Sequence, residues 1–262
     1  MRPAGAGDDG GGKTGYHRRN ARRRGSTMVR TDTIDADRVH GFVAHADYPS
    51  GGALVLPTIT GVDQPMQAIA RQLAEAGLTA LVWNPFHGDT SNPTDFPGLM
   101  ARANKLNDDL VDTHLSACID HMLGALRLRS VAVLGFCLGG RYSLLLAAHD
   151  QRLAACVAFY PSVRVPMKPN ETRDAIVLAT QISCPVHIVQ AGADEVIVFP
   201  TFLKLREVLE KRLVATMTQL HPGAVHSFMR PDLQSSPANV AATRLSWPPV
   251  LAFLQDSLRA AG

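Results

Sequence analysis

The sequence predicts an α/β fold in which helices cover both faces of a mostly parallel sheet, within a single domain. From about Val39 onward, short apolar runs alternate with segments of helical periodicity, as in successive βαβ units. The run Ala53–Pro57 is apolar throughout, which is typical of a strand buried inside a parallel sheet. The chain contains no internal repeat and no second core-forming region, so one domain is expected.

Each expected element follows from one of two patterns. Short apolar runs predict strands at Val39–His45, Ala53–Pro57, Thr79–Trp83, Ser130–Leu134, Ala155–Tyr160, Pro185–Gln190 and Ala215–Leu220. Apolar residues at i, i+3 and i+4 spacing predict helices at Gln64–Gly77, Asp109–Leu126, Leu138–His149, Pro200–Arg212 and Asn239–Ala260. The stretch Pro85–Gly98, rich in Pro, Gly, Asn and Asp, is a candidate lid or pocket wall, and Pro161–Ile182 shows no clear pattern.

The composition is that of a soluble protein from a reducing compartment. Of 262 residues, 46% are hydrophobic and 19% charged, and no apolar run is long enough for a membrane helix. The four cysteines, Cys118, Cys137, Cys156 and Cys184, form no CxxC pair, which argues against a disulfide scaffold or a zinc ribbon. We therefore expect a cytoplasmic protein that does not associate with membranes.

Residues 1–28 form a separate basic tail. Residues 1–30 hold 8 Lys/Arg and 2 Asp/Glu, and the resulting net charge of +6 is larger than the +3 of the whole chain. The tail has almost no large apolar residues, so we expect it to be disordered, with residues 29–262 forming the folded domain. No apolar stretch of the kind found in secretory signals follows the arginines, and Met28 is a candidate natural start. A nucleic-acid-binding arm is the alternative, but only Tyr16 supplies an aromatic ring, so we expect no nucleic-acid partner.

The most informative motif is Gly135-Phe136-Cys137-Leu138-Gly139-Gly140, which lies between an apolar strand and a helical pattern. This arrangement is typical of a nucleophile elbow, with cysteine as the nucleophile. The flanking glycines are required because the sharp strand-to-helix turn leaves no room for β-carbons. Cys137 would lie at a helix N-terminus, where the backbone amides favour a thiolate.

An acid and a histidine follow the elbow in the order expected for a catalytic triad. Asp194 follows the strand Pro185–Gln190, at the sheet edge that carries the elbow, and His226 lies in a glycine-containing loop after a later strand. Asp194 would orient the His226 ring, and His226 would accept the Cys137 proton and later activate water. Glu195 is the rival acid and His221 the rival base, and neither occupies the expected loop position.

The oxyanion of an acyl-transfer intermediate needs two hydrogen-bond donors. The backbone N–H of Leu138, directly after the nucleophile, is the expected first donor. The expected second donor is the N–H of Ile59, in the loop Thr58-Ile59-Thr60-Gly61 that follows a strand. A plain strand-to-helix turn is the alternative interpretation of this loop.

Other candidate sites are weaker. The ten histidines form no HExxH motif or other paired ligand spacing, and the sequence lacks a phosphate-binding GxxxxGK[ST] motif, so we expect neither a metal nor a cofactor. His87 and Asp89 could form a loop pair near the pocket, and turn chemistry is an equally good interpretation of His-Gly-Asp.

The chain resembles the dienelactone hydrolase family of α/β-hydrolases from about Val39 to Leu258. The resemblance rests on the segment 56–62, the elbow, Gly192-Ala193-Asp194 and His226-Ser227-Phe228. It implies an α/β-hydrolase fold with the family's Cys, Asp and His at Cys137, Asp194 and His226. It also implies substrate-binding roles for Arg230, shortly after the histidine, and for Arg102, the nearest candidate for a second arginine.

One position departs from the family pattern. Where relatives of the chlorocatechol pathway carry a glutamate that helps to activate the cysteine, this chain has Thr58, which lies beside the expected substrate site and cannot act as that base. We therefore expect hydrolysis of a small carboxylic ester or lactone, with acidic character suggested by Arg230, rather than of dienelactone specifically. We expect a monomer or weak homodimer. The alternative hypothesis is a non-hydrolytic small-molecule-binding or thiol redox-sensing protein that retains the fold.

Overall fold

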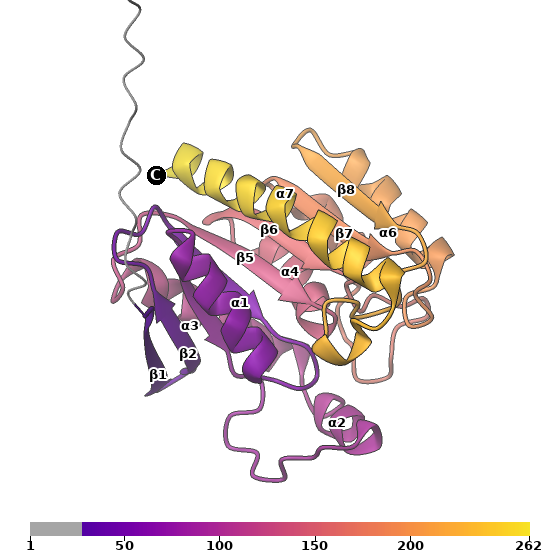
Figure 1. Ribbon diagram of the computed structural model, residues 1–262, viewed down its shortest axis with the longest axis horizontal. Helices are drawn as coiled ribbons and strands as arrows, with labels where there is room; N and C mark the ends of the chain where they lie inside the picture. The colour runs from indigo at the N-terminus through magenta and orange to yellow at the C-terminus, as the bar shows by residue number, and fades with distance from the viewer. Residues whose placement is uncertain (1–27) are drawn as a thin grey trace, which may run out of the picture.

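The computed structural model describes residues 28–262, at whose centre lies an eight-stranded sheet of order β1-β2-β4-β3-β5-β6-β7-β8 (Figure 1). The strands are β1 (Arg30–Ala36), β2 (Val39–His45), β3 (Gly52–Leu56), β4 (Thr79–Trp83), β5 (Val131–Phe136), β6 (Leu153–Phe159), β7 (Val186–Ala191) and β8 (Thr216–His221). The pairs β1–β2 and β2–β4 are antiparallel, and all other neighbouring strands are parallel. The predicted mostly parallel sheet is confirmed.

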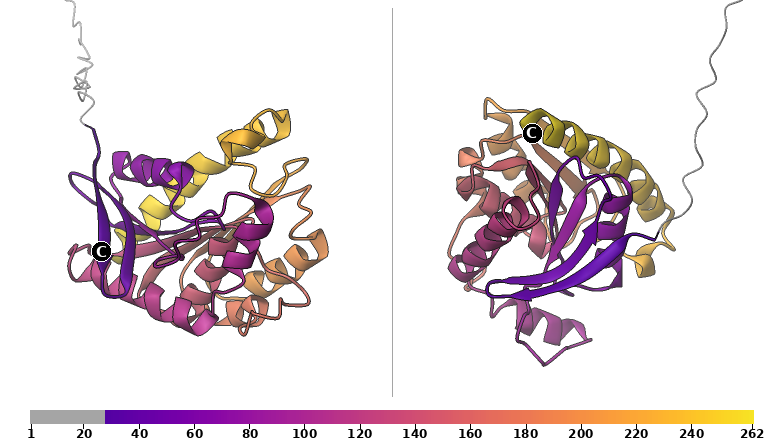
Figure 2. Two further views of the ribbon diagram at one scale, coloured as in Figure 1. Left: turned by 90° about the horizontal axis from the view of Figure 1, so that it is seen from below. Right: turned by 90° about the vertical axis from the view of Figure 1, so that its left-hand side faces the viewer.

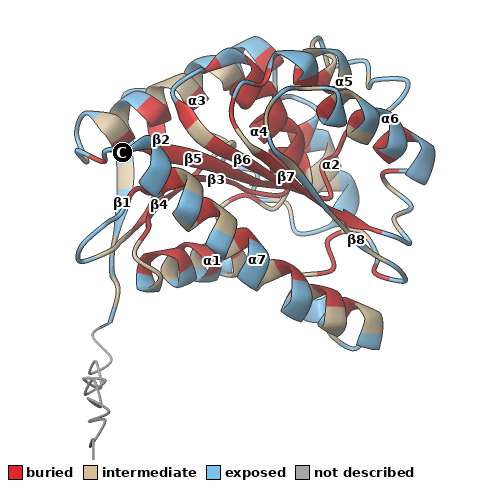
Figure 3. Cartoon of the chain, turned by 90° about the horizontal axis from the view of Figure 1, so that it is seen from above, coloured by how far each residue is buried: buried red, intermediate tan, exposed pale blue. Residues whose placement is uncertain are grey.

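Helices cover both faces of the sheet, as predicted. The helices are α1 (Gln64–Glu75), α2 (Phe96–Ala103), α3 (Asp108–Leu123), α4 (Leu138–His149), α5 (Ala175–Leu178), α6 (Phe199–Glu210) and α7 (Pro237–Ala261), with short 3₁₀ turns at Ala179–Gln181 and Pro231–Leu233. Figure 3 shows α1 and α7 on one face and α3, α4, α5 and α6 on the other. Each face buries its own apolar cluster against the sheet. Helix α2 lies apart from these layers, at the bottom of Figure 1.

Helix α1 illustrates how local sequence sets an element. Its predicted apolar face is buried, from Met66 to Leu73, against strands β2, β3 and β4. The Asp63 side chain accepts a hydrogen bond from the Met66 N–H, which satisfies one of the free donors at the helix start. Gly77, just past the end, has φ +87°, a conformation that glycine adopts without strain. The pattern therefore determined both the position and the limits of this helix.

Strand β1 and helix α2 differ from the sequence-based expectation, and the short helix α5 lies in the stretch 161–182, for which no pattern was found. Strand β1 was not expected, because its sequence is polar and its residues are partly or fully exposed, so it carries no apolar run. It forms by hairpin pairing with β2, in register from Arg30 opposite His45 to Ala36 opposite Val39 (Figure 2). Helix α2 begins at Phe96, inside the expected loop Pro85–Gly98, since Pro97 fits the first turn of a helix.

The predicted disordered tail, residues 1–28, lies outside the described residues except for Met28. Within residues 28–262, none of the helices combines the length and the apolar character that a membrane span requires. The parallel strands β5, β7 and β8 all end at the same edge of the sheet. Cys137, Asp194 and His226 follow the ends of these three strands.

Candidate active site

The predicted elbow joins β5 to α4 at Cys137. This residue is the N-cap of α4 and has φ 53° and ψ −111°, a conformation that side-chain-bearing residues rarely adopt. A β-carbon on Gly135 would lie 2.1 Å from the Gly139 carbonyl oxygen, and one on Gly139 would lie 2.1 Å from the Leu56 carbonyl oxygen. Both glycines are therefore required for close backbone packing around the turn, as predicted.

The structure brings together the three residues that the sequence singled out, here termed the candidate triad: Cys137, Asp194 and His226. The His226 Nε2 atom lies 3.0 Å from the Cys137 sulfur, and its Nδ1 atom lies 2.8 Å from Asp194 Oδ2. The side chain of Asp194 is 1% exposed and that of His226 is 14% exposed. The thiol, the imidazole and the carboxylate thus form one continuous hydrogen-bonded chain that is largely shielded from water.

The Asp194 carboxylate is held by its own loop. Its Oδ1 atom accepts hydrogen bonds from the backbone N–H groups of Val196 and Ile197, both at 2.8 Å. The Gln190 side-chain amide reaches Oδ2 at 3.5 Å. These contacts leave Oδ2 directed at His226 and fix the orientation of the ring.

The two rival residues lie outside this chain. Within the described residues, Glu195 is exposed and makes no hydrogen bond to His221 or His226. His221, at the end of β8, contacts the Gln219 side-chain oxygen at 3.1 Å through its Nε2 atom. Neither is placed to relay a proton from Cys137.

The electrostatics of the candidate triad favour a protonated His226. Burial alone would lower the pKa of His226, but the Cys137 thiolate and the hydrogen bonds to Asp194 and Cys137 outweigh it and raise this pKa to about 9. At neutral pH the ring is therefore protonated. A thiolate–imidazolium pair is the reactive form of a cysteine nucleophile.

The two expected oxyanion donors lie on adjoining segments. The Gly139 N–H donates to the Pro57 carbonyl at 3.0 Å, which joins the start of α4 to the loop after β3. Leu138 and Ile59 flank this contact. Within residues 28–262, neither of these two backbone N–H groups is bonded to a protein acceptor, as an oxyanion donor requires.

Thr58 is buried and belongs to a small hydroxyl network. Its Oγ1 atom lies 2.7 Å from Thr60 Oγ1, which donates to Asp63 Oδ2 at 2.6 Å. Since the Thr60 proton goes to Asp63, the Thr58 hydroxyl donates to Thr60. Thr58 therefore braces the loop that carries Ile59.

The two candidate substrate arginines lie in different surroundings. Arg102, on α2, is 8% exposed; its guanidinium lies 3.9 Å from the Phe86 ring centroid and donates to the Ile59 carbonyl at 3.3 Å. Arg230 is exposed and forms two hydrogen bonds to Asp232, at 2.9 and 2.8 Å. Arg230 also lines a cavity of about 390 Å³ between α1 and α7, to which Thr58 contributes as well.

Tyr160 is a site residue that sequence reasoning did not single out. It follows β6, with φ 36°, and its ring centroid lies 5.2 Å from that of His226. It is 2% exposed and also lines the cavity between α1 and α7; burial first, and then the nearby Cys137 and Asp194 charges, raise its pKa well above the ordinary value. Its position at the carboxyl end of a strand next to β5 was the available signal.

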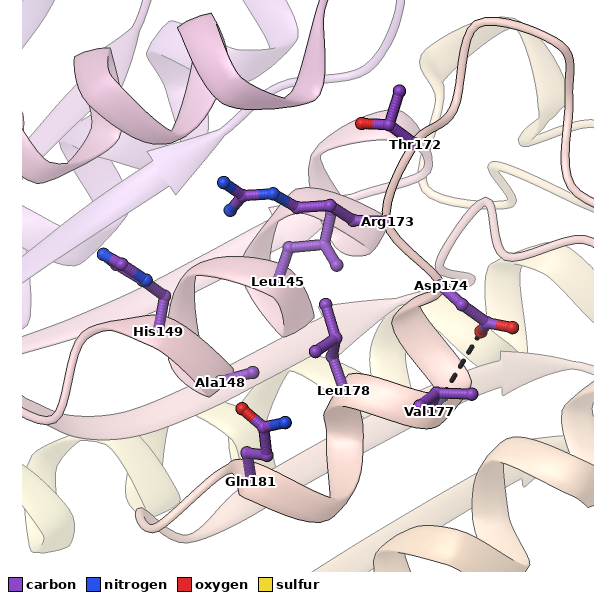
Figure 4. Close-up of a pocket in the computed structure, with 9 residues that line it drawn as sticks. All are labelled: Leu145, Ala148, His149, Thr172, Arg173, Asp174, Val177, Leu178 and Gln181. Atoms are coloured by element: carbon purple, nitrogen blue, oxygen red, sulfur yellow. Dashed lines mark hydrogen bonds between the residues drawn. The ribbon is translucent and has the colours of Figure 1, made fainter.

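A second hollow, of about 590 Å³, lies on the opposite helical layer. Figure 4 shows it between α4 and the segment that leads into α5, with Leu145, His149 and Arg173 among its lining residues. None of the candidate site residues lines it, whereas Thr58 and Arg230 line the cavity between α1 and α7.

Comparison with known proteins bears directly on this arrangement. A model of the dienelactone hydrolase family matches residues 39–258. The chain belongs to the dienelactone hydrolase family. A protein from Rhodococcus opacus named carboxymethylenebutenolidase is 29% identical over 235 residues, covering 86% of this chain and 89% of the relative.

Solved structures agree in fold. A dienelactone hydrolase-like promiscuous phosphotriesterase from metagenomic libraries superposes with a TM-score of 0.73 at 22% identity, covering 88% of this chain and 99% of that one. A dienelactone hydrolase from Anabaena variabilis gives a TM-score of 0.60 at 16% identity, covering 82% and 96%. The predicted α/β-hydrolase fold is confirmed, and family membership makes the chain a hydrolase of small carboxylic esters or lactones.

Proposed function

We propose that this dienelactone hydrolase family member cleaves its ester or lactone through an acyl-enzyme formed on Cys137. The observation that carries the proposal is the unbroken chain of contacts from Asp194 through His226 to the Cys137 sulfur. The thiolate attacks the carbonyl carbon, and the N–H groups of Leu138 and Ile59 bind the resulting oxyanion. Collapse of this intermediate expels the alkoxide, which takes the His226 proton and leaves as the alcohol.

The second half of the reaction uses the same groups. Neutral His226 removes a proton from water, the hydroxide attacks the thioester, and the second tetrahedral intermediate expels the Cys137 thiolate. The carboxylic acid leaves, and the thiolate–imidazolium pair is restored. Asp194 stabilises the imidazolium in both halves without taking up a proton itself.

The Thr58 position is consistent with this route. In the proposed cycle His226 accepts the Cys137 proton directly, so no additional base from the loop after β3 is required. Thr58 instead holds the loop through Thr60 and Asp63. We further propose that Arg230 favours acidic substrates, because this cationic residue lines the cavity between α1 and α7.

Time-resolved intact-mass spectrometry with p-nitrophenyl acetate tests the mechanism. The wild type should show a transient acetyl adduct, which should be absent in Cys137→Ala and slow to form in His226→Ala, with any adduct that does form persisting because water is no longer activated. An absence of adduct in the wild type, together with ready oxidation of Cys137 by mild peroxide, would favour the thiol-sensing alternative. Hydrolysis that survives in Cys137→Ala would exclude cysteine as the nucleophile.

A further inference from the structure

A cluster of potential metal ligands lies beside strands β1, β2 and β4, at the opposite end of the strand order from β7, which Asp194 follows. It comprises Asp35 near the end of β1, His40 near the start of β2 and His87 in the segment after β4, and is termed here the histidine cluster. One ligand atom from each residue lies within 4.8 Å of those from the other two. None of the three belongs to the candidate triad or to the loop that carries Ile59.

Both imidazole rings of the histidine cluster present a nitrogen atom to the same carboxylate oxygen. The imidazole rings of His40 and His87 are parallel, with an interplanar angle of 1° and centroids 3.2 Å apart. The Nδ1 atoms of the two rings lie 2.6 and 3.7 Å from the same carboxylate oxygen, Asp35 Oδ1.

We propose that Asp35, His40 and His87 form a binding site for a divalent transition-metal ion of the Zn²⁺ type. Two imidazole nitrogens and one carboxylate oxygen are a donor set that suits such ions, and bonds of about 2.1 Å in a tetrahedral arrangement require donor atoms about 3.3 Å apart. The 3.7 Å separation is already close to this value. To bind one ion, the 2.6 Å contact has to open and the parallel rings have to turn toward each other. The side chains of Asp35 and His87 permit this movement because they are 73% and 45% exposed.

The surroundings leave room for the ion and its remaining ligands. A hollow of about 270 Å³ borders the histidine cluster, and the polar side chains of Gln67 and Asn84 also line it. The sequence-based expectation of no metal centre rested on spacing within single segments. Here the three ligands come from separate segments that the hairpin and the end of β4 bring together, so no local motif reveals them.

Metal binding at this site would have a structural effect beyond the ligands. His87 follows Phe86, whose ring packs against the Arg102 guanidinium, and Arg102 in turn binds the Ile59 carbonyl. Because Asp35 and His40 belong to the hairpin of β1 and β2 and His87 follows β4, a bound ion would also fix the segment after β4 to the hairpin. The consequence expected from this link is a higher unfolding temperature in the presence of the metal.

Titration with Co²⁺ alone tests the proposal, because its visible spectrum distinguishes nitrogen and oxygen ligands from thiolate. The expected result for the wild type is one equivalent of Co²⁺ bound without a thiolate-to-cobalt charge-transfer band, unchanged after iodoacetamide treatment of Cys137. Binding should be lost in His87→Ala and weakened at least about tenfold in Asp35→Asn. His149→Ala is the matched control, since His149 is another exposed histidine beside an aspartate, 3.6 Å from Asp112, and should bind normally.

Three results would overturn the proposal. They are no Co²⁺ binding by the wild type, unchanged binding in a folded His87→Ala variant, and binding that shows the thiolate band and disappears on alkylation, which would place the ion at Cys137 and His226. Thermal unfolding without metal verifies that each variant folds. Because Asp35 is largely exposed, Asp35→Asn keeps the test decisive if His87→Ala proves unstable.

Discussion

Replacing Asp194 by asparagine tests the candidate triad most directly. Asparagine keeps an oxygen for the N–H groups of Val196 and Ile197, so the loop is expected to hold its shape. Its amide N–H₂, however, would face His226 Nδ1 and donate to it. The ring would then carry its proton on Nε2, toward the Cys137 sulfur, and could no longer accept a proton from it.

The size of the effect follows from the pKa of His226. A rise from the ordinary value of 6.5 to about 9 corresponds to about 3 kcal/mol in favour of the imidazolium, part of which Asp194 supplies. Loss of this part and of the correct tautomer is expected to raise the acylation barrier by about 3–5 kcal/mol, which slows acylation by about 10²–10⁴-fold.

Stopped-flow release of p-nitrophenol from p-nitrophenyl acetate measures acylation. Alkylation of Cys137 by iodoacetamide at neutral pH should also slow, because the thiolate loses part of the support of its imidazolium partner. Glu195→Gln is the matched control: it makes the same chemical change at the next residue, which is exposed, and should leave both rates unchanged. An Asp194→Asn variant that acylates within about threefold of the wild type would refute the role assigned to Asp194.

Three further predictions concern stability. Because the pKa of His226 is raised on folding, this residue contributes fully to the free energy of unfolding below about pH 6.5, and the contribution is lost as the pH rises through about 9. In urea unfolding, the His226→Gln variant should therefore lose less stability than the wild type over this pH range. Equal pH profiles of the two proteins would contradict the prediction. Gly139→Ala should lower the free energy of unfolding by about 3 kcal/mol or more, because the new β-carbon would meet the Leu56 carbonyl. Gly77→Ala should lower it by about 1 kcal/mol, because Gly77 has positive φ but open space around it. Equal denaturation midpoints of the two variants would rule out the steric explanation. Arg141→Met should lower the free energy of unfolding by about 3–5 kcal/mol, because it leaves the buried Asp108 carboxylate without the arginine that binds it at 2.8 Å in the wild type. A change under about 1 kcal/mol would show that the pair is dispensable.

The core of the fold and the candidate triad could be predicted because their signals are local. The apolar strands and the faces of the helices appear directly in residue periodicity, and the glycines of the elbow reflect a steric requirement that few other residues satisfy. Asp194 and His226 could be placed because parallel strands direct their following loops to one edge of the sheet. Residue order alone then sufficed to bring them near Cys137.

The features that could not be predicted depend on long-range contacts. Strand β1 is stabilised by its pairing with β2 and not by an apolar pattern of its own. The role of Arg102 was expected at the substrate, and its observed contacts with Ile59 and Phe86 depend on how α2 packs against the loop after β3. His87 was considered with Asp89, yet it stacks on His40, while the Asp89 carboxylate accepts the Ser91 N–H at 2.8 Å in a turn.

The polar hairpin strand β1 also determines how far the protein can be shortened. A strand at the border of a sheet presents unpaired backbone groups that can recruit a strand from another chain, and charged side chains discourage such pairing. β1 carries Arg30, Asp32 and Asp35 at this border, whereas β2 behind it is almost entirely buried. A chain that begins after Ala36 would expose the apolar strand β2 and is expected to aggregate, so a soluble truncated version has to keep Arg30 and the residues that follow it.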